Sequence, residues 1–259
     1  MSRLAAAAAA GTALTVADSP LTLAWFGSSS SGAMELRYFD GKGAVESSRL
    51  LLAMSGTAYT DTRWKMDMSK PYGQRCQGFM AAKKTGELEA NLDRAPILLV
   101  DGVAIGQSKS IERYIARRVG LYGANEIEAA QCDAFCEHLR DLKEMHGKAA
   151  DAKAFNAETL PAFFEKLEKV AGDKSCIVGK SLSIADVAFY ELVHEYFPAR
   201  DAYLAGKEPN AKKFNDQSAQ GAAMAKLESC PKLASSIAAV RKHPGVAEHI
   251  AGRQYTAPW

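Results

Sequence analysis

The first part of the chain alternates short strand-like runs with an amphipathic stretch. Residues 35–39 alternate apolar and polar side chains, as a half-buried strand does, and residues 40–43 supply the turn that follows. A helix is expected from about Ala44 to Met54, and a second strand from Ala58 to Arg63. This pattern predicts a β–α–β unit.

A second signal comes from a proline, a turn and a helix start. The apolar run Ile97–Val100 is typical of a strand buried on both faces, and Pro96 must open that strand because proline cannot donate to a ladder. A cis bond before Pro96 is compatible with this position. Asp101-Gly102 predicts a hairpin turn, and Ser108 is expected to be the N-cap of a helix. The free N–H groups and positive dipole end of that helix would attract a carboxylate.

Beyond residue 119 the pattern becomes wholly helical. Ser183 and Asp186 have the spacing of a capping box at the start of a buried helix. The expected helices cover residues 128–145, 160–170, 183–197 and 232–241, and the last of them ends at His243-Pro244-Gly245. The second half is therefore predicted to be an all-α bundle.

Residues 1–33 differ from the rest of the chain. They contain alanine and serine tracts with one arginine and one aspartate, which is typical of low-complexity or targeting sequence. Three interpretations are open: an organellar address, a secretory signal, or a start of translation at Met34. We expect a cytoplasmic protein, or a plastid or mitochondrial one if residues 1–33 are a targeting peptide.

Composition narrows the class of protein. A net charge of +2 gives no electrostatic footprint for nucleic acid, and no run of 18 apolar residues indicates a membrane span. The five cysteines include no CxxC pair, which argues for reduced thiols and against dithiol chemistry. Cys132 and Cys136 lie one helical turn apart with His138 nearby, but two thiols on a core or dimer face make a poor metal site without a third and a fourth ligand, so we expect no metal site.

The motifs together resemble the glutathione S-transferase family. The Tyr38-Phe39 strand end, followed by Gly43, Glu46 and Arg49, is similar to the start of the tyrosine-type members, closest to the sigma class. The resemblance implies a thioredoxin-like glutathione-binding domain over residues 34–119 and an all-helical C-terminal domain over residues 125–259. Relative to the family, the stretches 65–94 and 198–227 are expected to be insertions. The sequence does not indicate their role.

The resemblance also implies the site residues. Tyr38 is the expected catalytic residue, whose hydroxyl would stabilise the glutathione thiolate. Asp133 is expected to act from the partner subunit of a homodimer, although a solvated helix charge is an open alternative. The glutathione-binding residues expected from the family are Tyr38, Trp64, Lys84, Ala95, Pro96, Gln107, Ser108 and Asp133 of the partner subunit. Lys83 is an alternative to Lys84, and Ala44 stands where many sigma-class members carry arginine.

The implied activity is conjugation of glutathione, as co-substrate, to an electrophilic small molecule in a pocket between the domains. Two other functions stay open. One is a glutathione-dependent isomerase of the prostaglandin D synthase kind, and the other is a non-catalytic binding or scaffold protein built on the same fold. The sequence does not indicate the electrophile.

Overall fold

The computed structural model describes residues 32–150, 154–172, 175–197, 226–227 and 229–255. Residues Gly32–Trp259 form one compact unit. The expected leader lies outside the described residues apart from its last two positions, as does most of the expected insertion at 198–227. No helix within the described ranges is long and apolar enough to cross a membrane.

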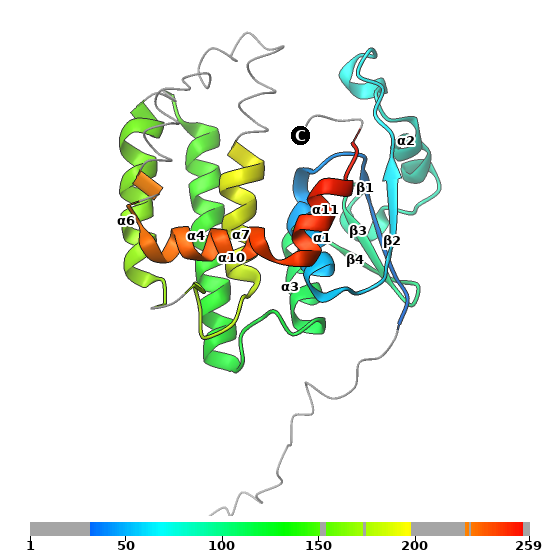
Figure 1. Cartoon of the computed structure of the whole chain (residues 1–259). Helices are drawn as coiled ribbons and strands as arrows, with labels where there is room; N and C mark the ends of the chain where they lie inside the picture. Colours follow the sequence, from blue (N-terminus) through cyan, green and yellow to red (C-terminus); the bar gives the residue numbers. More distant parts are fainter. Residues whose placement is uncertain (1–31, 151–153, 173–174, 198–225, 228, 256–259) are drawn as a thin grey trace, which may run out of the picture. The chain divides into compact units, whose positions relative to one another are not determined.

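A four-stranded sheet forms the first half of this unit (Figure 1). Strand β1 runs parallel to β2 and antiparallel to β3, and β4 closes a hairpin with β3. In spatial order the strands are β2 (Thr60–Trp64), β1 (Met34–Phe39), β3 (Ile97–Val100) and β4 (Val103–Gly106). The predicted strands are confirmed.

Two local predictions in this half are also confirmed. Asp101 and Gly102 connect β3 to β4 with φ values of 51° and 82°, the left-handed geometry of a two-residue hairpin turn. The Ala95–Pro96 bond is cis.

Helices cover both faces of the sheet. On one face, Leu36 and Leu98 pack in a core with Leu50 and Ile111. On the other face, Ile97 packs in a smaller cluster with Trp64. The helical elements of this half are η1 (Gly43–Val45), α1 (Glu46–Ser55), η2 (Tyr72–Gln74), α2 (Gln77–Lys84), η3 (Glu89–Asn91) and α3 (Ser108–Arg118).

The second half is helical, as predicted. Every residue of α7 is buried, so this helix is central to the core. The described elements are α4 (Glu126–Lys148), η4 (Phe155–Thr159), α6 (Leu160–Val170), α7 (Ile184–Glu191), η5 (Leu192–Tyr196), α10 (Pro231–Lys242) and α11 (Pro244–Gly252). The mixed α/β half followed by a helical half confirms the predicted fold class, and the exact domain boundaries stay a prediction.

The structure corrects one expectation and adds one helix. Gln107, not Ser108, is the N-cap of α3, because Ser108 is already the first residue of the helix. The backbone of Gln107 has a positive φ of 66°. The predicted end of the helix at His243-Pro244-Gly245 is confirmed, because α10 stops at Lys242, but a further helix that was not predicted follows directly. Pro244 opens α11, where a proline at the first helical position lacks only an N–H that the helix does not use.

Candidate active site

Tyr38 lies at the end of β1, and a tight turn holds its hydroxyl. The Tyr38 hydroxyl oxygen accepts a hydrogen bond of 3.1 Å from the backbone N–H of Ala44. Gly43 has a φ of 42°, and a Cβ added there would lie 2.5 Å from the Tyr38 hydroxyl oxygen. Glycine at position 43 therefore lets the turn approach the phenol closely.

The Tyr38 phenol stays protonated near neutral pH. Burial raises its pKa above the usual value of 10, and the Ala44 N–H and the Arg49 charge oppose that rise only in part. Since the hydroxyl accepts its hydrogen bond from Ala44, its own proton is free to donate to another atom. Tyr38 is thus a hydrogen-bond donor.

Tyr38 borders a cavity of about 710 Å³. Its walls come from the β1–η1 turn, the β2–α2 connection with α2, the start of α3, and the helices α4 and α7 with η5. The lining residues are Tyr38, Phe39, Lys42, Gly43, Ala44, Ser47, Met66, Tyr72, Gly73, Arg75, Cys76, Phe79, Met80, Ser108, Lys109, Glu112, Lys143, Glu191, Glu195 and Tyr196.

The start of α3 brings backbone donors to this cavity. Ser108 lines it, and the first N–H groups of α3 have no acceptor within their own helix. Gln107 precedes them with an exposed side chain and a φ of 66°. Pro96 is buried and directly precedes β3. Its carbonyl accepts a hydrogen bond of 2.9 Å from the Asn91 side chain.

Of the expected glutathione-binding residues in this chain, Tyr38 and Ser108 line the cavity, and the following do not: Trp64, Lys84, Ala95, Pro96 and Gln107. Trp64 is only 9% exposed and packs in the smaller core cluster, with its ring against Gly78. Lys84 is exposed on α2 and does not line the cavity. The α2 aromatic that reaches the cavity is Phe79, and the Lys83 ammonium lies 5.9 Å from the centre of its ring.

Asp133 lies on α4 and pairs within its own chain. Its carboxylate is 2.5 Å from the Arg113 guanidinium, which also contacts Glu137. The Asp133 side chain is 36% exposed. The expected role of Asp133 of the partner subunit stays a prediction.

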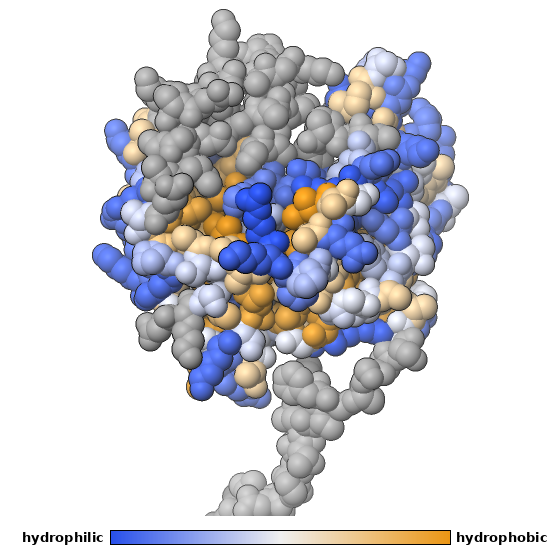
Figure 2. Space-filling model, in the orientation of Figure 1, coloured by the Kyte–Doolittle hydropathy of each residue, from blue (hydrophilic) through white to orange (hydrophobic). Residues whose placement is uncertain are grey.

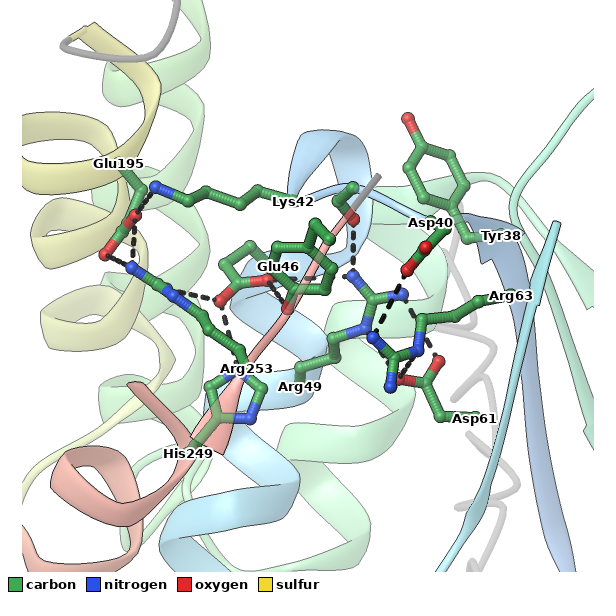
Figure 3. A network of polar contacts seen from close by, with 12 residues as sticks. Tyr38, Asp40, Lys42, Glu46, Arg49, Asp61, Arg63, Glu195, His249 and Arg253 are labelled. Atoms are coloured by element: carbon green, nitrogen blue, oxygen red, sulfur yellow. Dashed lines mark hydrogen bonds and ion pairs between the residues drawn. The ribbon is translucent and has the colours of Figure 1, made fainter. Parts of the chain in front are cut away.

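Behind the Tyr38 turn, a buried polar network joins α1 to the C-terminal helix (Figure 3). Glu46 accepts hydrogen bonds from Arg253 at 2.8 Å and from Tyr255 at 2.9 Å, and its carboxylate lies 3.0 Å from the His249 ring. Burial raises the pKa of Glu46, but His249, Arg49 and Arg253 outweigh it and bring that pKa to about 2. Glu46 is therefore ionised and fully compensated.

The network also reaches the cavity. Arg253 donates to Glu195 at 2.9 and 3.0 Å, and Glu195 in turn pairs with Lys42 of the Tyr38 turn at 2.5 Å. On the other side, Arg49 donates 2.6 Å to the carbonyl of Gly41. Figure 3 shows Tyr38 with its hydroxyl pointing away from these ion pairs. The network thus holds the turn in place while the Tyr38 hydroxyl points away from it.

Comparison with known proteins decides the family. A model of the glutathione S-transferase C-terminal domain matches residues 135–223. A hematopoietic prostaglandin D synthase of Gallus gallus is 31% identical, covering 77% of this chain and 98% of that protein. Glutathione S-transferase alpha-1 of Rattus norvegicus is 30% identical over 71% of this chain and 88% of its own length. The chain belongs to the glutathione S-transferase family.

Solved structures of the family have the same fold. A pi-class glutathione S-transferase of Onchocerca volvulus superposes with a TM-score of 0.62 at 23% identity, covering 85% of this chain and 93% of that one. The relatives above have names from different branches of the glutathione S-transferase family, so the expected sigma class stays a prediction.

Sequence reasoning missed most of the charged groups in the transferase cavity. Lys109 pairs with Glu112 on α3 at 2.7 Å, and Lys143 of α4 pairs with Glu191 of α7 at 2.7 Å. The first pair has a visible signal, a lysine and a glutamate three residues apart on one helix face. The second has none, because its partners are 48 residues apart and meet only through the packing of α4 against α7.

Proposed function

We propose that this family member conjugates the glutathione thiolate to electrophilic small molecules. The observation that carries the proposal is the Tyr38 hydroxyl, held in the cavity by the Ala44 N–H with its own proton free to donate. A hydroxyl that donates to a sulfur stabilises the thiolate over the thiol. Free thiols titrate near pH ~8.5, so this single hydrogen bond increases the fraction of nucleophile at neutral pH.

The remaining glutathione contacts follow the start of α3. The γ-glutamyl carboxylate would bind the free N–H groups at Ser108 and the amide of Gln107, where the positive end of the helix dipole lies. The backbone of Ala95 would pair with the cysteinyl residue, and Pro96 would fix that backbone. We expect a homodimer in which Asp133 of the partner subunit contacts the glutathione amine.

The reaction forms one carbon–sulfur bond. The thiol proton leaves to solvent, the sulfur attacks an electrophilic carbon, and the leaving group departs with its bonding pair. Tyr38 donates to the sulfur and keeps its own proton. Because the cavity extends from Tyr38 to α4, α7 and η5, it has room for an electrophile beside the sulfur.

A second function has one observation in its favour. The similarity to the prostaglandin D synthase of Gallus gallus extends over 98% of the length of that protein. A glutathione-dependent isomerase would use the same thiolate and return glutathione at the end of each cycle. An isomerase assay with that enzyme's substrate, run beside the conjugation assay, separates the two activities.

The direct test is the Tyr38→Phe variant, assayed with glutathione and chlorodinitrobenzene. We expect kcat/KM to fall at least about tenfold, which corresponds to ~1.4 kcal/mol of transition-state stabilisation. The pH midpoint of kcat/KM should also rise, because the bound thiol loses the hydrogen bond that favours its ionised form.

Tyr114→Phe is the matched control, since Tyr114 also accepts a hydrogen bond, from Arg118 at 3.0 Å, but does not line the cavity. Its rate and pH profile should equal those of the wild type. A Tyr38→Phe enzyme with an unchanged rate and pH midpoint would contradict the proposed role.

A further inference from the structure

One wall of the cavity comes from the long connection between β2 and α2. This connection carries Tyr72 and Arg75, and both line the cavity. The segment lies at the upper right of Figure 1, and the same region of Figure 2 mixes hydrophobic and hydrophilic residues. We call Tyr72 and Arg75 the accessory wall.

The accessory wall presents an aromatic ring to the cavity that Tyr38 borders. Tyr72 is 82% exposed, although the other aromatic residues of the cavity are only partly exposed. Tyr72 and Tyr38 border the same cavity. A planar group attached to the sulfur would therefore find an exposed ring to stack against.

Arg75 is held in place beside that ring. Its guanidinium carbon lies 5.8 Å from the centre of the Tyr72 ring, and its Nε donates 3.0 Å to the carbonyl of Lys70. The turn around it is closed, because the N–H of Asp67 donates 2.7 Å to the Arg75 carbonyl. One edge of the guanidinium is thus anchored.

The charges around the cavity single out Arg75. Three lysines line the cavity, and each has a carboxylate within 2.7 Å: Lys42 has Glu195, Lys109 has Glu112 and Lys143 has Glu191. In the described part of the chain, Arg75 makes no ion pair with a carboxylate. A cation without its own counterion at a ligand cavity favours a ligand that brings one.

We propose that the accessory wall selects electrophiles that combine a planar ring with a carboxylate. The ring lies against Tyr72, and the carboxylate binds the Arg75 guanidinium. This inference rests on the proposed transferase function and adds a substrate class to it. Glutathione itself carries carboxylates, so the experiment must also ask whether Arg75 binds the co-substrate.

Two electrophiles that differ in one charge test the inference. They are 4-chloro-3,5-dinitrobenzoate and its methyl ester. With each, the glutathione sulfur bonds to the carbon that bears chlorine, chloride leaves with the bonding pair, and the thiol proton goes to solvent. The measured quantity is the ratio of kcat/KM for the acid to kcat/KM for the ester. Comparing this ratio between variants cancels the intrinsic reactivity of the two compounds.

We expect Arg75→Gln to lower the acid-to-ester ratio about tenfold and Arg75→Lys to restore part of it, because lysine keeps the charge but not the planar fork. Tyr72→Ala should lower kcat/KM for both electrophiles, whereas Tyr72→Phe should not. Arg94→Gln is the matched control. Arg94 likewise donates through Nε to a backbone carbonyl, that of Asn91, but it is exposed and does not line the cavity.

A ratio that Arg75→Gln leaves unchanged overturns the inference. If the same variant instead raises KM for glutathione equally with both electrophiles, Arg75 binds the co-substrate and the inference is again wrong. Absence of turnover by the wild type with both compounds and with chlorodinitrobenzene would contradict the proposed function itself. Calorimetric binding of the two glutathione conjugates gives a readout without turnover, and only the acid conjugate should bind more weakly to Arg75→Gln.

Discussion

Gln107 combines an exposed side chain with a left-handed backbone. Its φ of 66° costs a non-glycine residue on the order of 1–3 kcal/mol. Strain of this kind persists where the surrounding structure holds a functional geometry. At the first turn of α3 it allows the chain to pass directly from β4 into the helix that points its free N–H groups at the cavity.

Replacing Gln107 with glycine distinguishes the effect of the backbone conformation from that of the side-chain amide. We expect Gln107→Gly to leave the melting temperature within a few degrees of the wild type, because glycine adopts this φ without strain. KM for glutathione should rise about tenfold, because one hydrogen bond to a charged group is lost. Thermal melts and steady-state kinetics measure the two effects.

Leu92→Gly is the control for that experiment. Leu92 has a φ of 52° and is 77% exposed, but it ends η3 and does not begin α3. It should leave both the melting temperature and KM near their original values. Equal KM values for the two glycine variants would show that the Gln107 amide does not bind glutathione.

Single residues of the site differ in how far the sequence predicts them. Tyr38 and Ser108 lie directly beside a strand end and a helix start, so local pattern places both at the cavity. Trp64 and Phe79 are separated by the long β2–α2 connection. Which of these two aromatics faces the cavity depends on the path of that connection, and composition carries no information about it.

At the scale of elements, several hydrogen bonds hold the start of α7 in place. The Asp186 carboxylate accepts hydrogen bonds from the Ile177 N–H at 2.8 Å, the Ser183 N–H at 2.9 Å and the Ser236 hydroxyl at 2.6 Å. Ser183 completes the predicted capping box, which is confirmed. One side chain thus ties a loop, the central helix and α10 together.

Asp186→Asn should destabilise the protein strongly. Both carboxylate oxygens accept from N–H groups, so an amide must turn its NH₂ toward one of these donors in either orientation. We expect a loss of about 3 kcal/mol in unfolding free energy, measured by urea denaturation. Asp141→Asn, an exposed change on α4, should cost less than about 0.5 kcal/mol. A similar small loss for Asp186→Asn would contradict this account.

Most elements follow from periodicity, because burial of one face imposes a spacing that the sequence must show. The expected helix at residues 160–170 matches α6. The unpredicted α11 is the exception. Its Pro244-Gly245 start has the composition of a helix stop, and only tertiary contact explains it, since a Cβ at Gly245 would lie 2.0 Å from the Ala53 carbonyl oxygen of α1.

For the whole molecule, the Glu46 network links stability to pH. Glu46 has a pKa of about 2 in the folded state against 4.5 as the ordinary value. A lowered carboxyl pKa stabilises the fold above the ordinary value, and this contribution is lost as pH falls from 4.5 toward 2. The shift corresponds to about 3 kcal/mol.

The variant Glu46→Gln tests this link. It should unfold more easily at pH 7, because Arg253 and His249 lose their buried counterion. Its unfolding free energy should also fall less steeply than that of the wild type below pH 4.5. Urea denaturation at several pH values measures both effects. Glu89→Gln, an exposed change, should keep the wild-type slope, and an identical slope for Glu46→Gln would refute the assignment.

The expected homodimer has a test with a built-in control. Asp133 and Glu137 both contact Arg113, but only Asp133 is expected to contact the glutathione of the other subunit. Asp133→Asn should raise KM for glutathione about tenfold, whereas Glu137→Gln should not. Sedimentation should show a dimer for all three proteins. A monomeric wild type, or equal KM values in the two variants, would rule out this role.

The same network has a consequence for how the chain is made. Glu46 contacts His249, Arg253 and Tyr255, which lie 203, 207 and 209 residues further along the chain. The ribosome produces the first half long before these partners exist, and contacts of such separation form late. The first half of the chain therefore cannot complete its interior while it is being synthesised. A nascent chain halted before residue 249 would hold a buried carboxylate at the start of α1 with Arg49 beside it but without its three C-terminal partners, a state that chaperones and proteases distinguish from the finished enzyme.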